Sequence, residues 1–250
     1  MLIRKAAAHG LTLSGAGALF ERMHGQPWQI LMYHRIIDPE SVAHPLEPGM
    51  YVRPKTFQLH MEHLAKHYNV WPLDELAQAV GEGKAIPPRT VAITFDDGWR
   101  DNYENAFPVL VKHELPATVF LATAFVGGSR LFWTDRLARA MLLLWENGGD
   151  VLQLSQKLDP PEERPALVAA QEIAHAVHAP NRRELDRRIE DTIGKLKRTP
   201  PEERLTLVDS VVARAEHYLN TEPERAFITW DESREMARSS IRFGCHTVDH

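Results

Sequence analysis

The chain has 250 residues, 44% of them hydrophobic and 25% charged, which suffices for one large α/β domain or two small ones. A net charge of −5 leaves no basic footprint for nucleic acid, so we expect no nucleic-acid partner. The single cysteine excludes an intrachain disulfide. No stretch approaches the roughly 18 apolar residues of a transmembrane span.

Residues 1–27 form an amino-terminal lead-in with basic residues followed by alanines, glycines and leucines. His9 and Ser14 interrupt its apolar part, and no small-x-small cleavage site follows. We interpret the segment as an amphipathic lead-in. The sequence leaves the localisation unknown, with a cytoplasmic or membrane-peripheral protein slightly favoured over an exported one.

The first predicted core strand, residues 29–34, ends in Tyr33 and His34. If this strand lies near strand 91–95, His34 sits at the rim where that strand ends. Tyr33 and His34 are therefore candidate substrate-binding residues, and a histidine that ties down the next loop is the alternative. Residues 38–54 contain four prolines and predict a loop.

Residues 55–67 have helical spacing, with Phe57, Met61 and Leu64 on one side. Three histidines on this segment could imitate a metal site, but no carboxylate motif accompanies them. We interpret them as solvated or capping residues; they are His60, His63 and His67.

The central stretch is a short apolar run, Val91–Phe95, followed by Asp96, Asp97 and Gly98. Its β-branched residues predict a buried strand. Carboxylates at the carboxyl end of a strand, with a glycine that turns the chain, mark the place where α/β proteins position their chemistry. One carboxylate could bind a metal and the other act as a base, or both could merely cap the following helix.

After Gly98, a helix from about Asn105 to His113 and a strand at 115–121 complete a strand–helix–strand unit. Such a crossover predicts a parallel sheet.

Residues 129–225 differ in character, because helical periodicity dominates them. The pentapeptide Pro-Pro-Glu-Glu-Arg at 160–164 and 200–204 is typical of a helix start. We predict a helical insertion that serves as a lid or side wall, with His175 and His178 on its surface. The periodic segments are 137–145, 167–177, 185–196 and 205–219.

The chain returns to the core at 227–230, and a short helix at 231–239, capped by Thr229 or Asp231, precedes a strand at 241–244. His246 and His250 follow at i and i+4, which share one face of a helical turn. Two such imidazoles and one carboxylate make a catalytic Zn²⁺ or Fe²⁺ site. Cys245 is interpreted as a small buried residue rather than a thiolate ligand.

Together, Thr-Phe-Asp-Asp-Gly at 94–98 and His-Thr-Val-Asp-His at 246–250 resemble the motifs of NodB-type polysaccharide deacetylases. Residues 31–36 and 229–236 are also similar to passages of that family. The resemblance implies an α/β fold, a deformed (β/α)₇ barrel. Residues 28–128 and 226–250 would form this domain, incomplete here, with 129–225 as the helical insertion.

The resemblance also implies the site. Asp97, His246 and His250 would bind one divalent metal, Zn²⁺ with Co²⁺ or Fe²⁺ as alternatives, and Asp96 would be the base. Metal-activated water would then attack the amide carbonyl of an N-acetylhexosamine polysaccharide or oligosaccharide. A glycan substrate and a hydrolase activity are therefore expected.

The sequence departs from the family at its end. The chain stops at His250, before the strands that in the family carry a groove motif and a general-acid histidine, so we expect a fragment of a longer protein. Two alternatives stay open: an amidohydrolase that acts on a non-glycan amide, and a catalytically inactive glycan-binding protein. The sequence does not indicate an oligomeric state.

Overall fold

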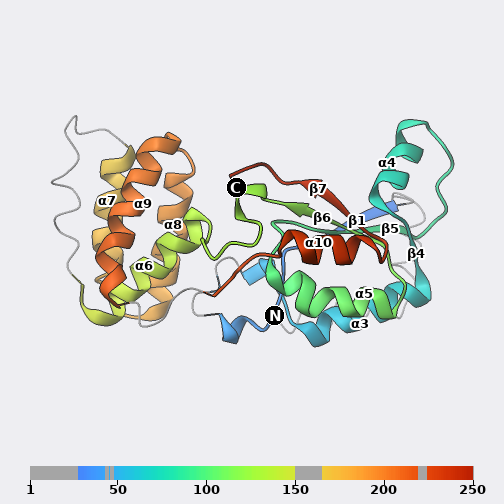
Figure 1. Ribbon diagram of the computed structural model, residues 1–250. Helices are drawn as coiled ribbons and strands as arrows, with labels where there is room; N and C mark the ends of the chain where they lie inside the picture. The colour runs from blue at the N-terminus through green and yellow to red at the C-terminus, as the bar shows by residue number, and fades with distance from the viewer. Residues whose placement is uncertain (1–27, 43–44, 46–47, 150–164, 219–223, 250) are drawn as a thin grey trace, which may run out of the picture.

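The computed structural model describes residues 28–42, 45, 48–149, 165–218 and 224–249. A sheet flanked by helices forms one part of the molecule, and a group of helices forms the other (Figure 1). The predicted lead-in 1–27 and His250 lie outside the described residues. Among the described residues, no helix has the length and apolar character needed to cross a membrane.

The sheet is parallel and is built around β5 (Thr90–Phe95), whose residues are all buried. The strand order is β1-β5-β6-β7, and a short fifth strand pairs with the start of β5. Because the strands are parallel, their carboxyl ends meet at one edge of the sheet, which brings the residues after β5 and β7 together. The other strands are β1 (Trp28–Tyr33), β4 (Asn69–Val70), β6 (Ala117–Leu121) and β7 (Ile241–Cys245).

These pairings confirm the predicted α/β class and parallel sheet. They also confirm that the first core strand lies beside the central one, since β1 pairs with β5 along its whole length. Within the described residues the five strands form an open sheet. A separate pair, β2 (Arg35–Ile36) and β3 (Tyr51–Val52), brackets the proline-rich loop, which holds two 3₁₀ turns at Pro39–Ser41 and Pro48–Met50.

Helices α3 (Pro54–His67), α4 (Leu73–Gly81), α5 (Phe107–Lys112) and α10 (Trp230–Ala237) accompany the sheet (Figure 1). The predicted buried side of α3, with Phe57, Met61 and Leu64, is confirmed. A capping box of Thr229 and Glu232 starts α10, as predicted for Thr229.

The helix after the central strand starts later than predicted. Asn102–Ala106 form a π-helical turn, and regular α-helix begins only at Phe107. Pro108 has no N–H to donate, and its ring crowds the carbonyl four residues earlier, so a wider turn precedes it.

The insertion contains α6 (Trp133–Asn147), α7 (Pro165–Ala176), α8 (Arg182–Leu196) and α9 (Pro201–Ala215), followed by a 3₁₀ turn at Glu216–Tyr218. These helices share a hydrophobic core of their own, to which α6, α8 and α9 contribute fully buried residues such as Leu137, Leu185 and Val208. The helix start at 200–204 and the exposed positions of His175 and His178 are confirmed, whereas 160–164 lies outside the described residues. The division of the chain into domains stays a prediction.

Candidate metal and catalytic site

The turn after β5 has an unusual backbone. Asp97 and Gly98 both have φ of 75°, the left-handed region. A Cβ at Gly98 would lie 2.6 Å from Leu121 Cδ2, so this position requires glycine. Aspartate is one of the few other residues that tolerate this region, and such outliers gather at functional sites. The turn buries Asp97 at 1% exposure, at the carboxyl edge of the sheet.

The Asp97 carboxylate is held between an indole and an imidazole. Trp99 Nε1 donates a hydrogen bond to Oδ2 at 2.9 Å, and His246 Nε2 lies 3.6 Å from Oδ1. Two ligands on one Zn²⁺ at about 2.1 Å and a tetrahedral angle lie about 3.4 Å apart. The Asp97 and His246 atoms therefore fit a shared divalent ion, with Trp99 orienting the carboxylate as hydrogen-bonded partners of metal ligands do.

His246 is fixed by its backbone, not by a helix. Its N–H donates to Leu121 O at 2.8 Å, and the next residues bond to the 3₁₀ turn Thr123–Phe125, with Thr123 N donating to Thr247 O at 3.2 Å. The prediction of a helical turn here is wrong, because Thr247 has a φ of 65° and residues 246–249 are not helical. A chain that leaves an edge strand and pairs with a neighbouring turn cannot wind into a helix at once.

The third predicted ligand, His250, lies outside the described residues. Among the residues that are described, no group of three or more His, Cys, Asp or Glu side chains is placed to hold a metal. The ligand set Asp97, His246 and His250 therefore stays a prediction, of which the structure brings the first two together.

Asp96, the predicted base, lies at the same edge as Asp97. Its N–H donates to Tyr33 O at 2.9 Å, and its Oδ2 lies 3.9 Å from His34 Nε2. The side chains of both Asp96 and His34 keep some exposure, 14% and 20%. His34 thus lies at the rim where the sequence placed it.

Tyr33 and Cys245 lie elsewhere than predicted. Tyr33 is buried in the core, with its ring stacked 5.5 Å from that of Phe95 and its hydroxyl hydrogen-bonded to His60 Nδ1 at 3.2 Å. Burial raises the pKa of Tyr33 to about 12. It shares its register with Phe95, so the two rings face the same side of the sheet.

Cys245 was expected to be buried, and that prediction is wrong. Its side chain is exposed, and Sγ donates to Thr247 O at 3.4 Å. It ends β7, the last strand in the order of the described sheet, where no further strand covers it.

A buried network that the sequence did not single out supports the site. Arg35 Nε donates to Asp101 Oδ2 at 2.6 Å, and Ile36 N donates to Asp101 Oδ1 at 2.6 Å. Burial raises the pKa of Asp101, while Arg35 opposes that shift. The Arg35 guanidinium also lies over the Trp99 ring, 4.1 Å from its centroid. The network therefore packs directly against the indole that holds Asp97.

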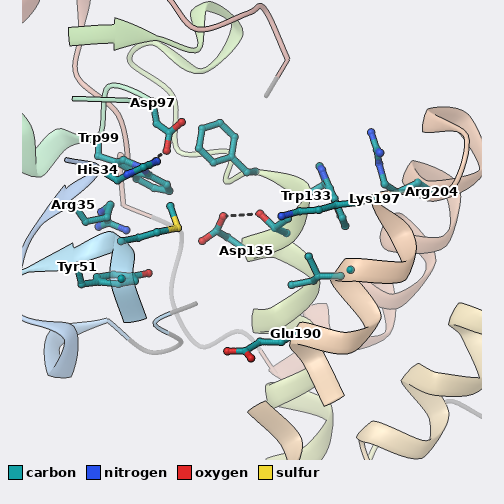
Figure 2. A pocket seen from close by; sticks show the side chains of 16 residues that line it. His34, Arg35, Tyr51, Asp97, Trp99, Trp133, Asp135, Glu190, Lys197 and Arg204 are labelled. Carbon is teal, nitrogen blue, oxygen red and sulfur yellow. Dashed lines mark hydrogen bonds between the residues drawn. The ribbon is translucent and has the colours of Figure 1, made fainter. Parts of the chain in front are cut away.

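A cleft of about 780 Å³ opens beside the site. One wall comes from the sheet edge and the proline-rich loop, and the other comes from the insertion (Figure 2). The first wall includes His34, Arg35, Tyr51, Asp97 and Trp99, and the second includes Trp133, Asp135, Glu190, Lys197 and Arg204. The insertion therefore forms a side wall of the cleft that contains the predicted metal ligand Asp97.

Comparisons with known proteins find similarity to polysaccharide deacetylases. Residues 83–152 match the family model for polysaccharide deacetylases. The Bacillus subtilis protein YxkH, named as a polysaccharide deacetylase, is 35% identical over 99 residues, which cover 39% of this chain and 33% of that protein. The poly-β-1,6-N-acetyl-D-glucosamine N-deacetylase of Staphylococcus epidermidis is 40% identical over 70 residues, 28% of this chain and 24% of that protein.

Among solved structures, a de-N-acetylase from Aggregatibacter actinomycetemcomitans aligns with a TM-score of 0.42 and 16% identity, over 89% of this chain and 55% of that one. The matches to the curated relatives span a third or less of the length of each. The match to the polysaccharide deacetylase family model covers the segment that carries β5, α5 and β6.

Proposed function

We propose that this chain is part of a metal-dependent hydrolase that removes N-acetyl groups from an N-acetylhexosamine-containing glycan. The observation that carries the proposal is the 3.6 Å between Asp97 Oδ1 and His246 Nε2, with Asp96 at the same edge of the sheet. The relative from Staphylococcus epidermidis is named for a β-1,6-linked glycan, which makes that linkage the first substrate to test.

Asp97 and His246, together with His250, would hold the ion. A divalent ion such as Zn²⁺, Co²⁺ or Fe²⁺ would supply Lewis acidity there, lowering the pKa of a water to about 7 and polarising an amide carbonyl. Asp96 would take the proton from the attacking water, because it lies at the same edge and keeps an accessible carboxylate. His34, 3.9 Å from Asp96 Oδ2, would keep that carboxylate turned toward the site.

The test separates metal binding from turnover. We expect Asp97→Ala to lose the metal, measured as bound metal per chain after dialysis. We expect Asp96→Asn to keep the metal and to release acetate from β-1,6-linked N-acetylglucosamine oligomers about 10²–10⁴-fold more slowly. Acetate release from β-1,4-linked oligomers, measured in parallel, tests whether the enzyme prefers the β-1,6 linkage.

Asp231→Ala is the control, since Asp231 is exposed on α10 and pairs only locally with Arg234. It should match the unchanged chain in both measurements. Metal retained by Asp97→Ala would overturn the ligand assignment. No acetate release from any oligomer by the metal-loaded protein isolated from its native source would overturn the proposed activity.

A further inference from the structure

Asp135 stands out among the residues that line the cleft from the insertion. It lies in the first turn of α6, and its side chain extends toward the wall formed by Arg35 and Tyr51 (Figure 2). Glu190, from α8, lies at the exposed rim of the same cleft. Asp135 therefore brings a carboxylate from the insertion into the space beside Asp97.

The surroundings of Asp135 leave its carboxylate poorly satisfied. Within the part of the chain that the structure describes, Thr134 is the only other side chain hydrogen-bonded to it, with Oγ1 3.1 Å from Oδ2. Burial raises the pKa of the Asp135 carboxyl to about 6, and the negative charge of Asp97 adds to the effect. A desolvated carboxylate with one side-chain donor and its own backbone N–H as partners has remaining capacity to accept hydrogen bonds from a ligand.

We propose that Asp135 is a substrate-contacting specificity residue, whose carboxylate accepts hydrogen bonds from hydroxyl or amide N–H groups of a glycan lying in the cleft. The proposal rests on the proposed deacetylase function and deepens it, because it assigns part of the substrate site to the insertion. A hexosamine chain fits this role, since each sugar unit carries several hydroxyl donors and an acetamido N–H.

The cleft has room for such a ligand. Its volume of about 780 Å³ lies in the range of about 300–1,000 Å³ that is usual for ligand pockets. The Arg204 guanidinium lies over the Trp133 ring, 4.8 Å from its centroid, so an aromatic residue of this wall is already fixed in place. Gly194 of α8, which also lines the cleft, leaves space there, because a Cβ at this position would meet nothing within 4 Å.

A structural role is the rival explanation. An acidic residue in the first turn of a helix stabilises the helix through its dipole. That role predicts that removal of the charge lowers the melting temperature and that glycan binding changes only through misfolding. A ligand-binding role predicts the opposite pattern, since the raised pKa means that the charge is disfavoured in the folded protein. Asp135→Asn should then keep or raise the melting temperature and weaken binding.

The experiment measures binding of β-1,6- and β-1,4-linked N-acetylglucosamine oligomers to the metal-free 250-residue chain by calorimetry. Asp135→Asn is expected to weaken binding about tenfold or more, the usual scale for a hydrogen bond to a charged group. Gly194→Leu, which adds a side chain to the lining of the cleft, should weaken binding as well. Glu146→Gln, at the exposed far end of α6, is the matched control and should bind as the unchanged chain does.

Acetate release by the metal-loaded chain separates the two proposals. A raised KM with a smaller change in kcat for Asp135→Asn would support the assignment. Unchanged affinity and KM in an active Asp135→Asn would overturn the role of Asp135 and leave the deacetylase function standing. Binding that depends on Asp135 without acetate release would overturn the function and retain the contact. A lower melting temperature for Asp135→Asn, unchanged binding by Gly194→Leu, or the absence of oligomer binding would also overturn the inference.

Discussion

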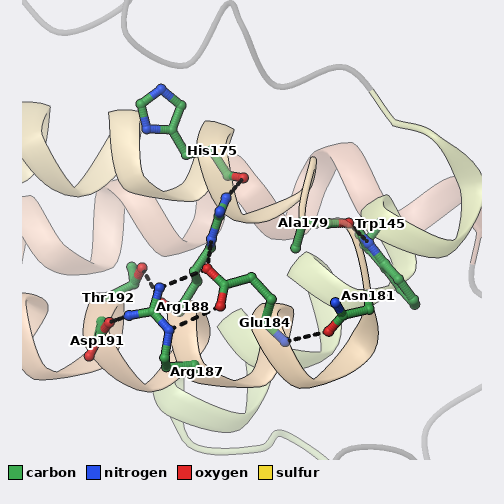
Figure 3. Close-up of polar contacts among 9 residues, drawn as sticks. All are labelled: Trp145, His175, Ala179, Asn181, Glu184, Arg187, Arg188, Asp191 and Thr192. Atoms are coloured by element: carbon green, nitrogen blue, oxygen red, sulfur yellow. Dashed lines mark hydrogen bonds and ion pairs between the residues drawn. The ribbon is translucent and has the colours of Figure 1, made fainter.

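The sheet region and the insertion use polar side chains in different ways. In the sheet region they join distant parts of the chain: Arg35 to Asp101 across 66 residues, and Asn102 to the carbonyl of His34 across 68. On α8 of the insertion most of them join residues three or four apart, such as Arg187 with Glu184 and Asp191, and only a few, such as Arg188 to His175 O, reach another helix (Figure 3). The long-range hydrogen bonds fix the geometry around Asp97, whereas the local pairs lie on the solvent-facing side of α8.

The difference shows which interactions hold each region in its folded structure. The insertion depends on the hydrophobic core shared by its helices. The turn that carries Asp97 depends in addition on buried polar contacts, which are costly to leave half-made. Substitutions should therefore affect the two regions differently.

The largest effect is expected from Asp101→Ala. It leaves the Arg35 guanidinium and the Ile36 N–H without their buried partner, which should lower the free energy of unfolding by about 3–5 kcal/mol. Urea unfolding measures the loss. Asp38→Ala is the control, because it removes an exposed partner of Arg53 and should change stability little. Similar stabilities for both variants would contradict the importance of the buried network.

Next in size is Leu137→Ala in the core of the insertion. Leu137 is fully buried, and its loss should cost about 2–5 kcal/mol of unfolding free energy. Metal affinity should persist, since neither Asp97 nor His246 packs in this core. Leu205→Ala, at a position 42% exposed on α9, should cost far less. A parallel fall in metal affinity in Leu137→Ala would show that the two regions do not act independently.

Asp135→Asn tests the cleft, where the sheet region and the insertion meet. A carboxyl with a pKa of about 6 when folded and 3.8 when unfolded makes the protein less stable as pH rises from about 4 to 6. The groups that face it are Arg35, which favours its charge, and Asp97, which opposes it. Removing the charge should therefore stabilise the metal-free chain more at pH 7.5 than at pH 4.5, by about 2 kcal/mol. A gain independent of pH would show that Asp135 titrates normally.

Much of the fold follows from local signals, which explains what the sequence predicts well. The apolar run Val91–Phe95 and the carboxylates after it indicate a buried strand and a site, and helical periodicity identifies α3 and the insertion helices. Arg35 and Asp135 were missed because their partners lie far away in sequence or across the cleft. Trp99 was missed although Asp97 is two residues away, because the direction of its indole depends on the left-handed turn at Asp97 and Gly98. Tyr33 was predicted to bind substrate but is buried. The alternation of side chains along a strand does not show which face of the sheet the helices cover, so the sequence did not indicate that Tyr33 faces the core.

Trp99→Phe removes one hydrogen bond from the site and keeps the ring. The indole is stacked 4.6 Å from Phe227, and phenylalanine can retain that contact. Without the Nε1 donor to Asp97, metal affinity should fall about 10–100-fold with little change in melting temperature. Trp145→Phe is the matched control, since its Nε1 donates to Ala179 O at 2.8 Å within the insertion. Equal metal affinities in the two variants would contradict the proposal that Trp99 positions the Asp97 carboxylate.

The smallest effect is expected from Arg187→Gln on α8. Hydrogen bonds from Arg187 and Arg188 lower the pKa of the Glu184 carboxyl to about 2, but all three groups face solvent (Figure 3). The variant should raise the pKa of Glu184 toward its ordinary value, measured by NMR titration, and leave the melting temperature unchanged at pH 7. Any stabilisation by this pair would be lost only as pH falls below about 4.5. A clear drop in melting temperature at pH 7, absent from Arg183→Gln on the same helix, would mean that surface pairs and not the hydrophobic core hold the insertion together.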